Sequence, residues 1–146
     1  MAKVLACILL TTAFIACSKK DTKLIAEIGE HPAGGTNIEE LSCTIVGRLI
    51  DGETPIDAII EWWWSDSTGG NEQAIAQRSY TFSEEVWEEY TAIIEAPTGY
   101  YFFQYFWVKV TWQNEDESEH EIESDKAWCD IDTNLGDAYP VISVGQ

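Results

Sequence analysis

The sequence predicts an all-β fold, an antiparallel sandwich of about seven strands behind an N-terminal leader and tether. From residue 41 onward, short stretches of alternating apolar and polar residues are separated by clusters of turn-forming residues. No stretch has the periodicity of a convincing amphipathic helix. The chain of 146 residues is 45% hydrophobic and 12% aromatic, which is enough apolar material for the core of one domain.

The expected strands follow from this alternation and from the turns between them. Gly, Pro, Asn and Asp, the residues typical of turns, cluster at 51–55, 65–71, 97–99 and 114–118. The strands between them are 41–50, 58–64, 74–82, 86–96, 100–113 and 119–131, and a short helix starting at 83–85 is the alternative there. We therefore divide the chain into a leader at 1–16, a tether at 17–40 with a candidate short strand at 24–28, a sandwich domain at 41–132 and a C-terminal tail at 133–146.

The middle of the chain resembles immunoglobulin-like and fibronectin type III-like sandwiches. The run Pro97-Thr98-Gly99-Tyr100-Tyr101, followed by a long alternating strand, is similar to the start of their penultimate strand. Trp62 or Trp64 resembles their central core tryptophan. The resemblance covers about residues 41–132 and implies two packed antiparallel sheets. The chain departs from antibody-type domains because Cys129 falls in the last expected strand.

The N-terminus has the features of a bacterial export signal. Lys3 is followed by a short apolar stretch, Val4 to Ile15, whereas a membrane span needs roughly 20 apolar residues. The run Phe14-Ile15-Ala16-Cys17 resembles the lipobox of bacterial lipoproteins. This resemblance implies cleavage before Cys17 and attachment of lipid, palmitate included, to this cysteine. The alternative is an ordinary secreted protein in which Cys17 is incidental.

A lipid on Cys17 makes a membrane the first expected partner. Each buried acyl CH₂ contributes roughly 0.8 kcal/mol, so several acyl chains anchor a protein essentially permanently. Ser18 is not the aspartate that retains many lipoproteins at an inner membrane, so we expect the outer membrane of a cell envelope, on its periplasmic or its surface-exposed face. Lys19, Lys20 and Lys23 bring positive charge beside the phosphate headgroups.

The four cysteines reduce to one expected pair. Cys7 leaves with the leader and Cys17 carries the lipid, so Cys43 and Cys129 remain in an oxidising compartment. A disulfide between them would close a long loop and stabilise the fold by roughly 4 kcal/mol. The alternative is a reactive thiol or a metal pair, which neither a Cys-x-x-Cys motif nor a nearby histidine supports.

The charge of the chain argues against nucleic acid as a partner. With 8 basic against 26 acidic residues, the formal charge is −18, whereas binding a nucleic-acid backbone needs clustered Lys and Arg. The chain has no zinc-protease motif, nucleophile elbow or phosphate-binding loop, and no carboxylate pair stands out for acid–base chemistry. We therefore expect neither an enzyme nor a required cofactor.

One acidic run has the spacing of a calcium-binding loop. Oxygen-bearing side chains alternate at Asp130, Asp132 and Asn134, although Gly136 and Val141 depart from the EF-hand pattern. The run 114–117 is a second candidate for a hard cation such as Ca²⁺. The alternative for both runs is a polar turn or tail.

A stripe of aromatic residues is the strongest indication of a binding surface. Lys109, Thr111 and Gln113 set the odd positions of strand 100–113 toward solvent, and Glu61 does the same for strand 58–64. In the expected sheet these two strands are neighbours, so one outward face carries Trp63, Tyr101, Phe103, Tyr105 and Trp107. The alternative is that a bulge near Gln104 turns the stripe inward, or that the tether or tail packs over it.

Contiguous exposed aromatic residues usually mark an interaction site. The sequence therefore predicts a non-enzymatic binding module for a partner protein or a glycan. Aromatic faces beside carboxylates suit sugar rings, through stacking and hydrogen bonds to hydroxyl groups, and they equally suit a protein surface. The alternatives are a small glycan-active enzyme or accessory subunit that uses surface carboxylates, and a purely structural spacer.

Overall fold

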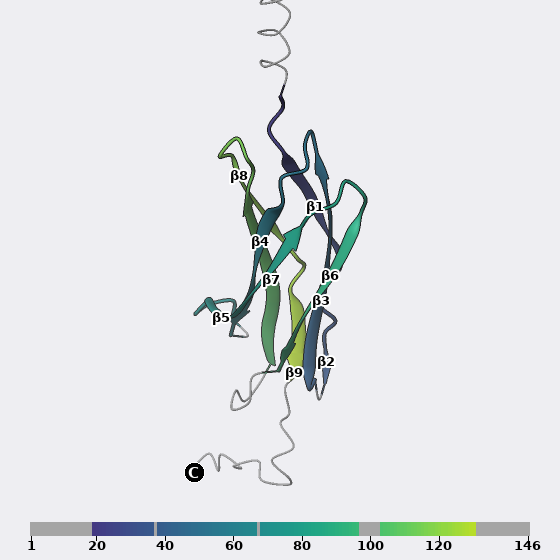
Figure 1. Cartoon of the computed structure of the whole chain (residues 1–146). Helices are drawn as coiled ribbons and strands as arrows, with labels where there is room; N and C mark the ends of the chain where they lie inside the picture. Colours follow the sequence, from purple (N-terminus) through teal and green to yellow (C-terminus); the bar gives the residue numbers. More distant parts are fainter. Residues whose placement is uncertain (1–18, 37, 67, 97–102, 131–146) are drawn as a thin grey trace, which may run out of the picture.

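A computed structural model describes residues 19–36, 38–66, 68–96 and 103–130, and the regular elements in these ranges are all β-strands. No helix within them is long and apolar enough to cross a membrane. Figure 1 shows two sheets packed face to face, which confirms the all-β, two-sheet expectation. The strands are β1 (Lys23–Glu30), β2 (Gly35–Thr36), β3 (Glu40–Ile50), β4 (Ile56–Ser65), β5 (Gln73–Phe82), β6 (Glu88–Glu95), β7 (Phe103–Gln113), β8 (Glu119–Glu123) and β9 (Ala127–Asp130).

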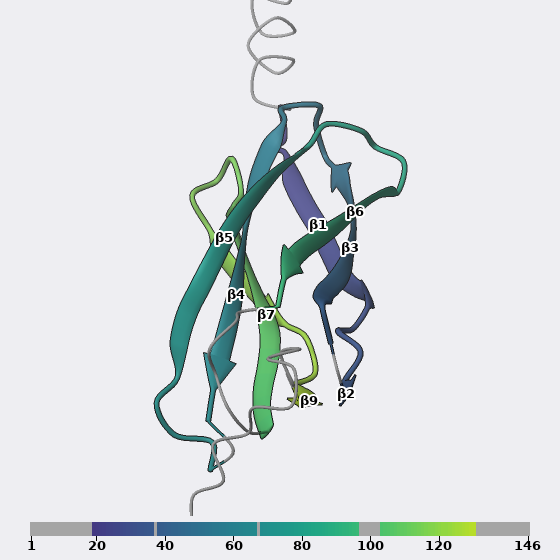
Figure 2. The same ribbon diagram turned by 90° about the horizontal axis from the view of Figure 1, so that it is seen from below.

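The strand order defines a three-stranded and a six-stranded sheet. The first runs β1-β3-β6, and the second runs β2-β9-β7-β4-β5, with β8 also paired to β7. The pairs are antiparallel except for β2 with β9. Figure 2 shows the chain leaving the end of β5 and returning as β6 in the other sheet. The connections from β3 to β4, from β5 to β6 and from β6 to β7 all cross between the sheets, so the two sheets are tied together at several points.

The core lies between the sheets and is built from every second residue of each strand. In β3, the expected inward set is confirmed, because Leu41, Cys43, Ile45 and Leu49 are all buried. The six-stranded sheet contributes a group of fully buried side chains from β4 and β7, namely Ile60, Trp62, Phe106, Val108 and Val110. Apolar burial contributes about 25 cal/mol per Å² of surface removed from water, so this interlayer is the main source of stability.

The pairing of β7 with β4 confirms that these two strands are neighbours and that Trp63, Tyr105 and Trp107 lie on one side of the sheet. It runs without a shift from Ala58 opposite Trp112 to Ser65 opposite Tyr105. Gln104 therefore points into the core, where it is only 3% exposed. The indole N–H of Trp64 donates a hydrogen bond to the Gln104 side-chain carbonyl, which satisfies the buried amide. The bulge lies instead on the other side of β4, between Trp62 and Trp63 in the pairing with β5.

The sandwich begins earlier than residue 41. β1 pairs with β3 along nearly its whole length, and β2 pairs with β9, so residues 23–30 and 35–36 of the expected tether at 17–40 belong to the sheets. The candidate strand at 24–28 is confirmed and extended at both ends. Leu24 is 4% exposed, and Ala26 and Ile28 pack against the core. Ile25 and Glu27 between them face outward, so apolar residues on both faces hide the alternation when the segment is judged by composition alone.

The last expected strand is two strands, and residues 83–85 form no helix. The break between β8 and β9 occurs at Ser124, whose backbone N–H donates to the Val108 carbonyl while its hydroxyl accepts from the Val108 N–H. The side chain of Ser124 thus replaces a backbone partner, and the chain shifts before β9. At residues 83–84 the two backbone N–H groups donate to the carboxylate of Glu88, which forms a loop rather than a helical turn.

The segment before β1 is fixed to one end of the sandwich. Thr22 is only 1% exposed, and its backbone N–H donates to the Glu115 carboxylate over 2.8 Å. Its hydroxyl accepts from the Thr54 N–H, and the Leu24 N–H donates to the Asn114 side-chain oxygen. A side chain on Gly52 would lie 2.1 Å from the Thr22 hydroxyl oxygen, so the turn at 51–55 closes directly over this residue. Thr22 is therefore clamped between the β3–β4 and β7–β8 turns.

Candidate functional site

The outer face of the six-stranded sheet carries a cluster of aromatic residues, which we call the tryptophan face. It consists of Trp63 on β4, Tyr105 and Trp107 on β7, and Trp128 on β9. Trp63 lies opposite Trp107, and Tyr105 lies opposite Trp128, so all four share one side of the sheet. The Trp63 and Trp107 rings are stacked, with centroids 6.2 Å apart and planes 28° apart.

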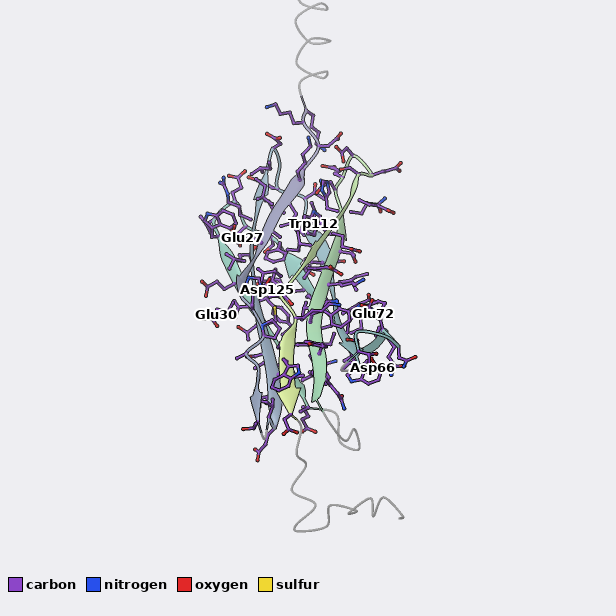
Figure 3. The ribbon with its side chains drawn as sticks, turned by 180° about the vertical axis from the view of Figure 1, so that it is seen from behind. Glu27, Glu30, Asp66, Glu72, Trp112 and Asp125 are labelled. Carbon is purple, nitrogen blue, oxygen red and sulfur yellow. The ribbon has the colours of Figure 1, made fainter. Side chains whose placement is uncertain are left out.

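Two lysines lie over this face. The Lys109 ammonium is 4.3 Å from the Trp63 ring centroid, and that of Lys126 is 4.0 Å from the Trp107 centroid. Lys109 forms an ion pair of 3.1 Å with Glu123, and Lys126 forms one of 3.0 Å with Glu72, which projects from the loop before β5 (Figure 3). Each ammonium group therefore combines a cation–π contact with an ion pair.

The electrostatics of the tryptophan face are dominated by carboxylates. The hydrogen bond from Lys109 to Glu123 raises the pKa of this lysine, and the nearby charges of Glu121 and Glu72 act in the same direction, while desolvation opposes them. The Trp63 indole N–H donates to Glu61 over 3.2 Å. The face thus offers aromatic rings bordered by hydrogen-bond acceptors, and Lys109 is held there as a positive charge.

Exposure differs from the expectation at one central residue. Trp107 faces outward as the register requires, but it is only 1% exposed, so its predicted exposure is wrong. The Trp63 ring and the Lys126 side chain cover it. Trp63 and Tyr105 are half-buried. Phe103 is the first residue of β7, opposite Asp130, and Tyr101 lies outside the described residues.

Sequence reasoning missed Trp128, which is 46% exposed and the most accessible ring of the tryptophan face. A signal for it was present. Ala127 and Cys129 on either side are 5% and 0% exposed, so simple alternation places Trp128 outward. The expected strand at 119–131 obscured this pattern, because the break at Ser124 resets the register of the strand that follows.

The two remaining cysteines are buried in the core, one on a strand of each sheet. Cys43 on β3 and Cys129 on β9 are 1% and 0% exposed, and both are free thiols in this structure. Burial raises the pKa of Cys43 to about 12, and burial raises that of Cys129 as well. Buried thiols of this kind are poor nucleophiles. The expected disulfide is not formed here, although the two thiols are buried in one core on strands of opposite sheets.

The calcium candidates receive no support from the described residues. Asp130 ends β9, while Asp132 and Asn134 lie outside the described residues. Across 19–36, 38–66, 68–96 and 103–130, no three His, Cys, Asp or Glu side chains are grouped so that they could hold a metal ion. In the run 114–117, Asn114, Glu115 and Asp116 use their side-chain oxygens to accept hydrogen bonds from nearby protein groups.

One Ser-His-Asp set lies at the β7–β8 turn, but its connectivity is not that of a catalytic triad. The Ser118 hydroxyl is 3.3 Å from Nε2 of His120, and the same hydroxyl donates to Asp116. In a triad the carboxylate holds the imidazole, so that the ring can take the proton of the hydroxyl group. Here the carboxylate holds the hydroxyl group as part of the turn, and the His120 ring stacks on Trp112 with centroids 5.4 Å apart.

A groove of about 750 Å³ opens between the edge strands β5 and β6. Ile75, Arg78 and Ile93 line it, together with Glu40 and Glu95, which are opposite each other in the pairing of β3 with β6. Both carboxylates are exposed. A glycosidase general acid needs a desolvated carboxyl group, so this side-by-side exposed pair lacks the required environment.

Comparison with known proteins identifies no family. No protein-family model and no curated protein matches the chain. Among solved structures, it is similar to Spo0M, a sporulation control protein from Bacillus subtilis, with a TM-score of 0.44 and 10% identity over 76% of this chain and 50% of that one. It is also similar to a beta-glucosidase from Listeria innocua in complex with glucose, with a TM-score of 0.42 and 12% identity over 75% of this chain and 16% of that one. The chain thus spans half or less of each of these proteins, and likenesses at this level assign no function.

Proposed function

We propose that this chain is an exported, lipid-anchored envelope protein whose β-sandwich binds a partner protein or a glycan through the tryptophan face, without catalysis. The observation that carries the proposal is the position of Trp128. Its ring is 46% exposed, directly opposite Tyr105 and beside the covered pair of Trp63 and Trp107. Exposed aromatic surface next to fixed polar groups is typical of interaction sites.

The finer fold assignment belongs to the same proposal. In immunoglobulin-like sandwiches the first, second and fifth strands share one sheet, and the third, sixth and seventh share the other. The order β1-β3-β6 opposite β9-β7-β4 follows this arrangement, and β5 extends the second sheet beyond β4. This supports an immunoglobulin-like or fibronectin type III-like sandwich, with β2 and β8 as additions to it.

The chemistry of the face decides what it can bind. A sugar ring can stack on Trp128 while its hydroxyl groups donate hydrogen bonds to carboxylates of the face. Two of these carboxylates, Glu72 and Glu123, are fixed in position by ion pairs with Lys126 and Lys109. A protein partner can use the same rings as the centre of an interface. The acidic surroundings, in a chain of formal charge −18, favour a neutral or basic ligand in either case.

The membrane anchor rests on the leader and on the residues around Cys17. Lipid on Cys17 would place the protein on the envelope, with the outer membrane as its location. The lysines that follow are already partly engaged by the sandwich, because Lys20 and Lys23 pair with Asp51 and Asp116. This supports a sandwich that stays close to its anchor.

The test compares two tryptophans of similar exposure. Trp128 is 46% exposed on the tryptophan face, whereas Trp87 is 50% exposed on the β5–β6 loop. We expect Trp128→Ala to weaken the capture of envelope glycan or protein by at least about tenfold, which corresponds to about 1.4 kcal/mol. Trp87→Ala should capture the same component as the wild type.

Capture is measured on solubilised envelope with the purified mature chain, and each captured component is typed by its sensitivity to protease or to glycan hydrolases. A component lost equally from both variants, or from neither, contradicts the tryptophan face as the binding site. Failure of all three proteins to capture anything would favour the structural spacer.

A further inference from the structure

The β5–β6 loop presents the two most exposed large hydrophobic side chains of the described residues. Val86 is 68% exposed and Trp87 is 50% exposed, and they are adjacent in the chain. Neither belongs to the core or to the tryptophan face. Adjacent apolar side chains in water at a loop tip need an explanation, because nothing in the packing of the sandwich requires them there.

The loop holds these side chains in a fixed position. The Leu49 N–H donates to the Glu84 carbonyl over 2.8 Å, which ties the loop to β3. The Glu88 carboxylate accepts from the backbone N–H groups of residues 83 and 84, and this closes the loop on itself. The Arg48 guanidinium lies 5.2 Å from the Trp87 ring centroid. The apolar tip is therefore a built feature with a cation beside its indole ring.

The tip lies at the end of the sandwich where the N-terminal segment joins it, and Figures 1 and 2 agree on this placement. Contacts connect the two places. Lys20 pairs with Asp51 over 3.6 Å, and Asp51 is two residues beyond Leu49, which bonds the loop. The clamp on Thr22 fixes this end to the segment that leads back to Cys17.

We propose that Val86 and Trp87 form a second contact with the membrane, inserting into the lipid–water interface once the chain is anchored through Cys17. This rests on the lipid anchor of the proposed function and is independent of what the tryptophan face binds. Only residues 18–21 separate Cys17 from the clamped Thr22, so the two are joined by five residue steps, a length of about 17 Å at full extension. The headgroup region is about 5–8 Å deep, so the tether keeps this end of the sandwich within about 10 Å of it.

The residue types suit an interfacial contact of limited depth. Tryptophan favours the lipid–water interface, where its ring meets the acyl boundary and its N–H stays hydrated. Arg48 lies beside the Trp87 ring and supplies a positive charge at the tip, while the neighbouring carboxylates of Glu84 and Glu85 oppose deep insertion and anionic lipids. The apolar tip is small, so the contact depends on the high local concentration that the anchor provides.

The experiment uses the mature chain coupled through Cys17 to a maleimide lipid in phosphatidylcholine vesicles. Coupling is selective because Cys43 and Cys129 are buried. Lipids brominated along their acyl chains quench only tryptophans that reach them. We expect quenching of the wild-type protein, loss of that quenching in Trp87→Ala, and a strong reduction in Val86→Asp.

Trp128→Ala is the matched control and should be quenched like the wild type. Absence of quenching in the wild type, or unchanged quenching in Trp87→Ala, overturns the proposal and leaves the tip in water. Because the lipid is attached chemically, the outcome does not depend on whether a cell modifies Cys17. It also does not depend on ligand capture by Trp128, so failure of this inference and failure of the proposed function give different results.

Discussion

Basic side chains are scarce in this acidic chain, and three of them lie over tryptophan rings. Arg48, Lys109 and Lys126 are 5.2, 4.3 and 4.0 Å from the rings of Trp87, Trp63 and Trp107. A long basic side chain can cover an apolar ring with its stem while its charged group stays in water. The lysines thus turn an aromatic stripe on the outside of a sheet into a partly closed layer, in which Trp107 is covered and Trp128 is accessible.

The substitution Trp107→Ala tests how much the packing of this layer contributes to the free energy of unfolding. Because Trp107 is 1% exposed, its removal should cost roughly 3–5 kcal/mol of unfolding free energy, as for a core aromatic residue. Trp128→Ala should change stability by only about 0.5 kcal/mol. Urea unfolding midpoints of the two variants check both values. A midpoint for Trp107→Ala that equals the wild type would show that the ring is not packed as described.

Alternation along single strands was sufficient to predict β3, β4 and β7 and the side of the sheet on which their residues lie. It failed where a residue's state depends on a distant partner. The burial of Trp107 requires Lys126 and Glu72, and the buried Gln104 amide is satisfied by Trp64, forty residues away. Trp128 was missed because the Ser124 break lies between two short strands that read as one.

The first strand shows the same limit at the level of an element. β1 carries Lys, Glu and Gly residues, and only Leu24, Ala26 and Ile28 face the core. An edge strand with one solvated face has a composition close to that of a linker. Its membership of the sheet follows from pairing with β3, which no local pattern specifies.

The opposing elements β3 and β9 carry the one pair of cysteines available for a cross-sheet bridge. We expect non-reducing mass mapping of the exported mature chain to find Cys43 joined to Cys129. Both side chains are buried and point into the same core from opposite sheets, so a bridge there would restrain the separation of the sheets on unfolding. Two free thiols in protein isolated from an oxidising compartment would contradict the bridge.

The pH dependence of the stability of the reduced protein distinguishes free thiols from a disulfide. Burial raises the pKa of Cys43 to about 12 from its ordinary value of 9.0, so the unfolded chain loses this proton first. Stability is unaffected by this thiol below pH 9 and falls between pH 9 and about 12, by up to about 1.4 kcal/mol per pH unit. Cys43→Ala, measured in reducing buffer, should lack this contribution. The oxidised protein should also lack it.

The whole molecule has two different ends. The end near the leader gathers Lys19, Lys20 and Lys23, the carboxylates of Glu115, Asp51 and Asp116 that pair with them, the clamped Thr22 and the apolar loop tip. If the chain is anchored through Cys17 as proposed, its formal charge of −18 would keep the body of the domain away from an anionic bilayer, while the apolar tip would be the part in contact with lipid. The tryptophan face then runs along the side of the sandwich, open to components of the envelope.

Export with lipidation is tested on the whole chain. Cys17→Ala should move the protein from the membrane fraction to soluble export, or leave it unprocessed with its leader attached, because the acyl chains supply the anchoring energy. Fractionation with incorporation of labelled fatty acid measures this. Membrane association that is unchanged in Cys17→Ala, with no label in the wild type, would remove the lipoprotein assignment.

The clamp on Thr22 also determines how the molecule would carry a mechanical load. A partner that pulls on the side of the sandwich pulls against the anchor, and the force enters the domain at the start of β1. Because this force runs along the axis of β1, it loads the hydrogen bonds to β3 together, in shear, and does not open them one at a time as peeling would. Resistance to forced unfolding is set by the rate of unfolding rather than by equilibrium stability. If the chain is anchored through Cys17 as proposed, β1 would therefore be the strand through which a mechanical load enters the domain.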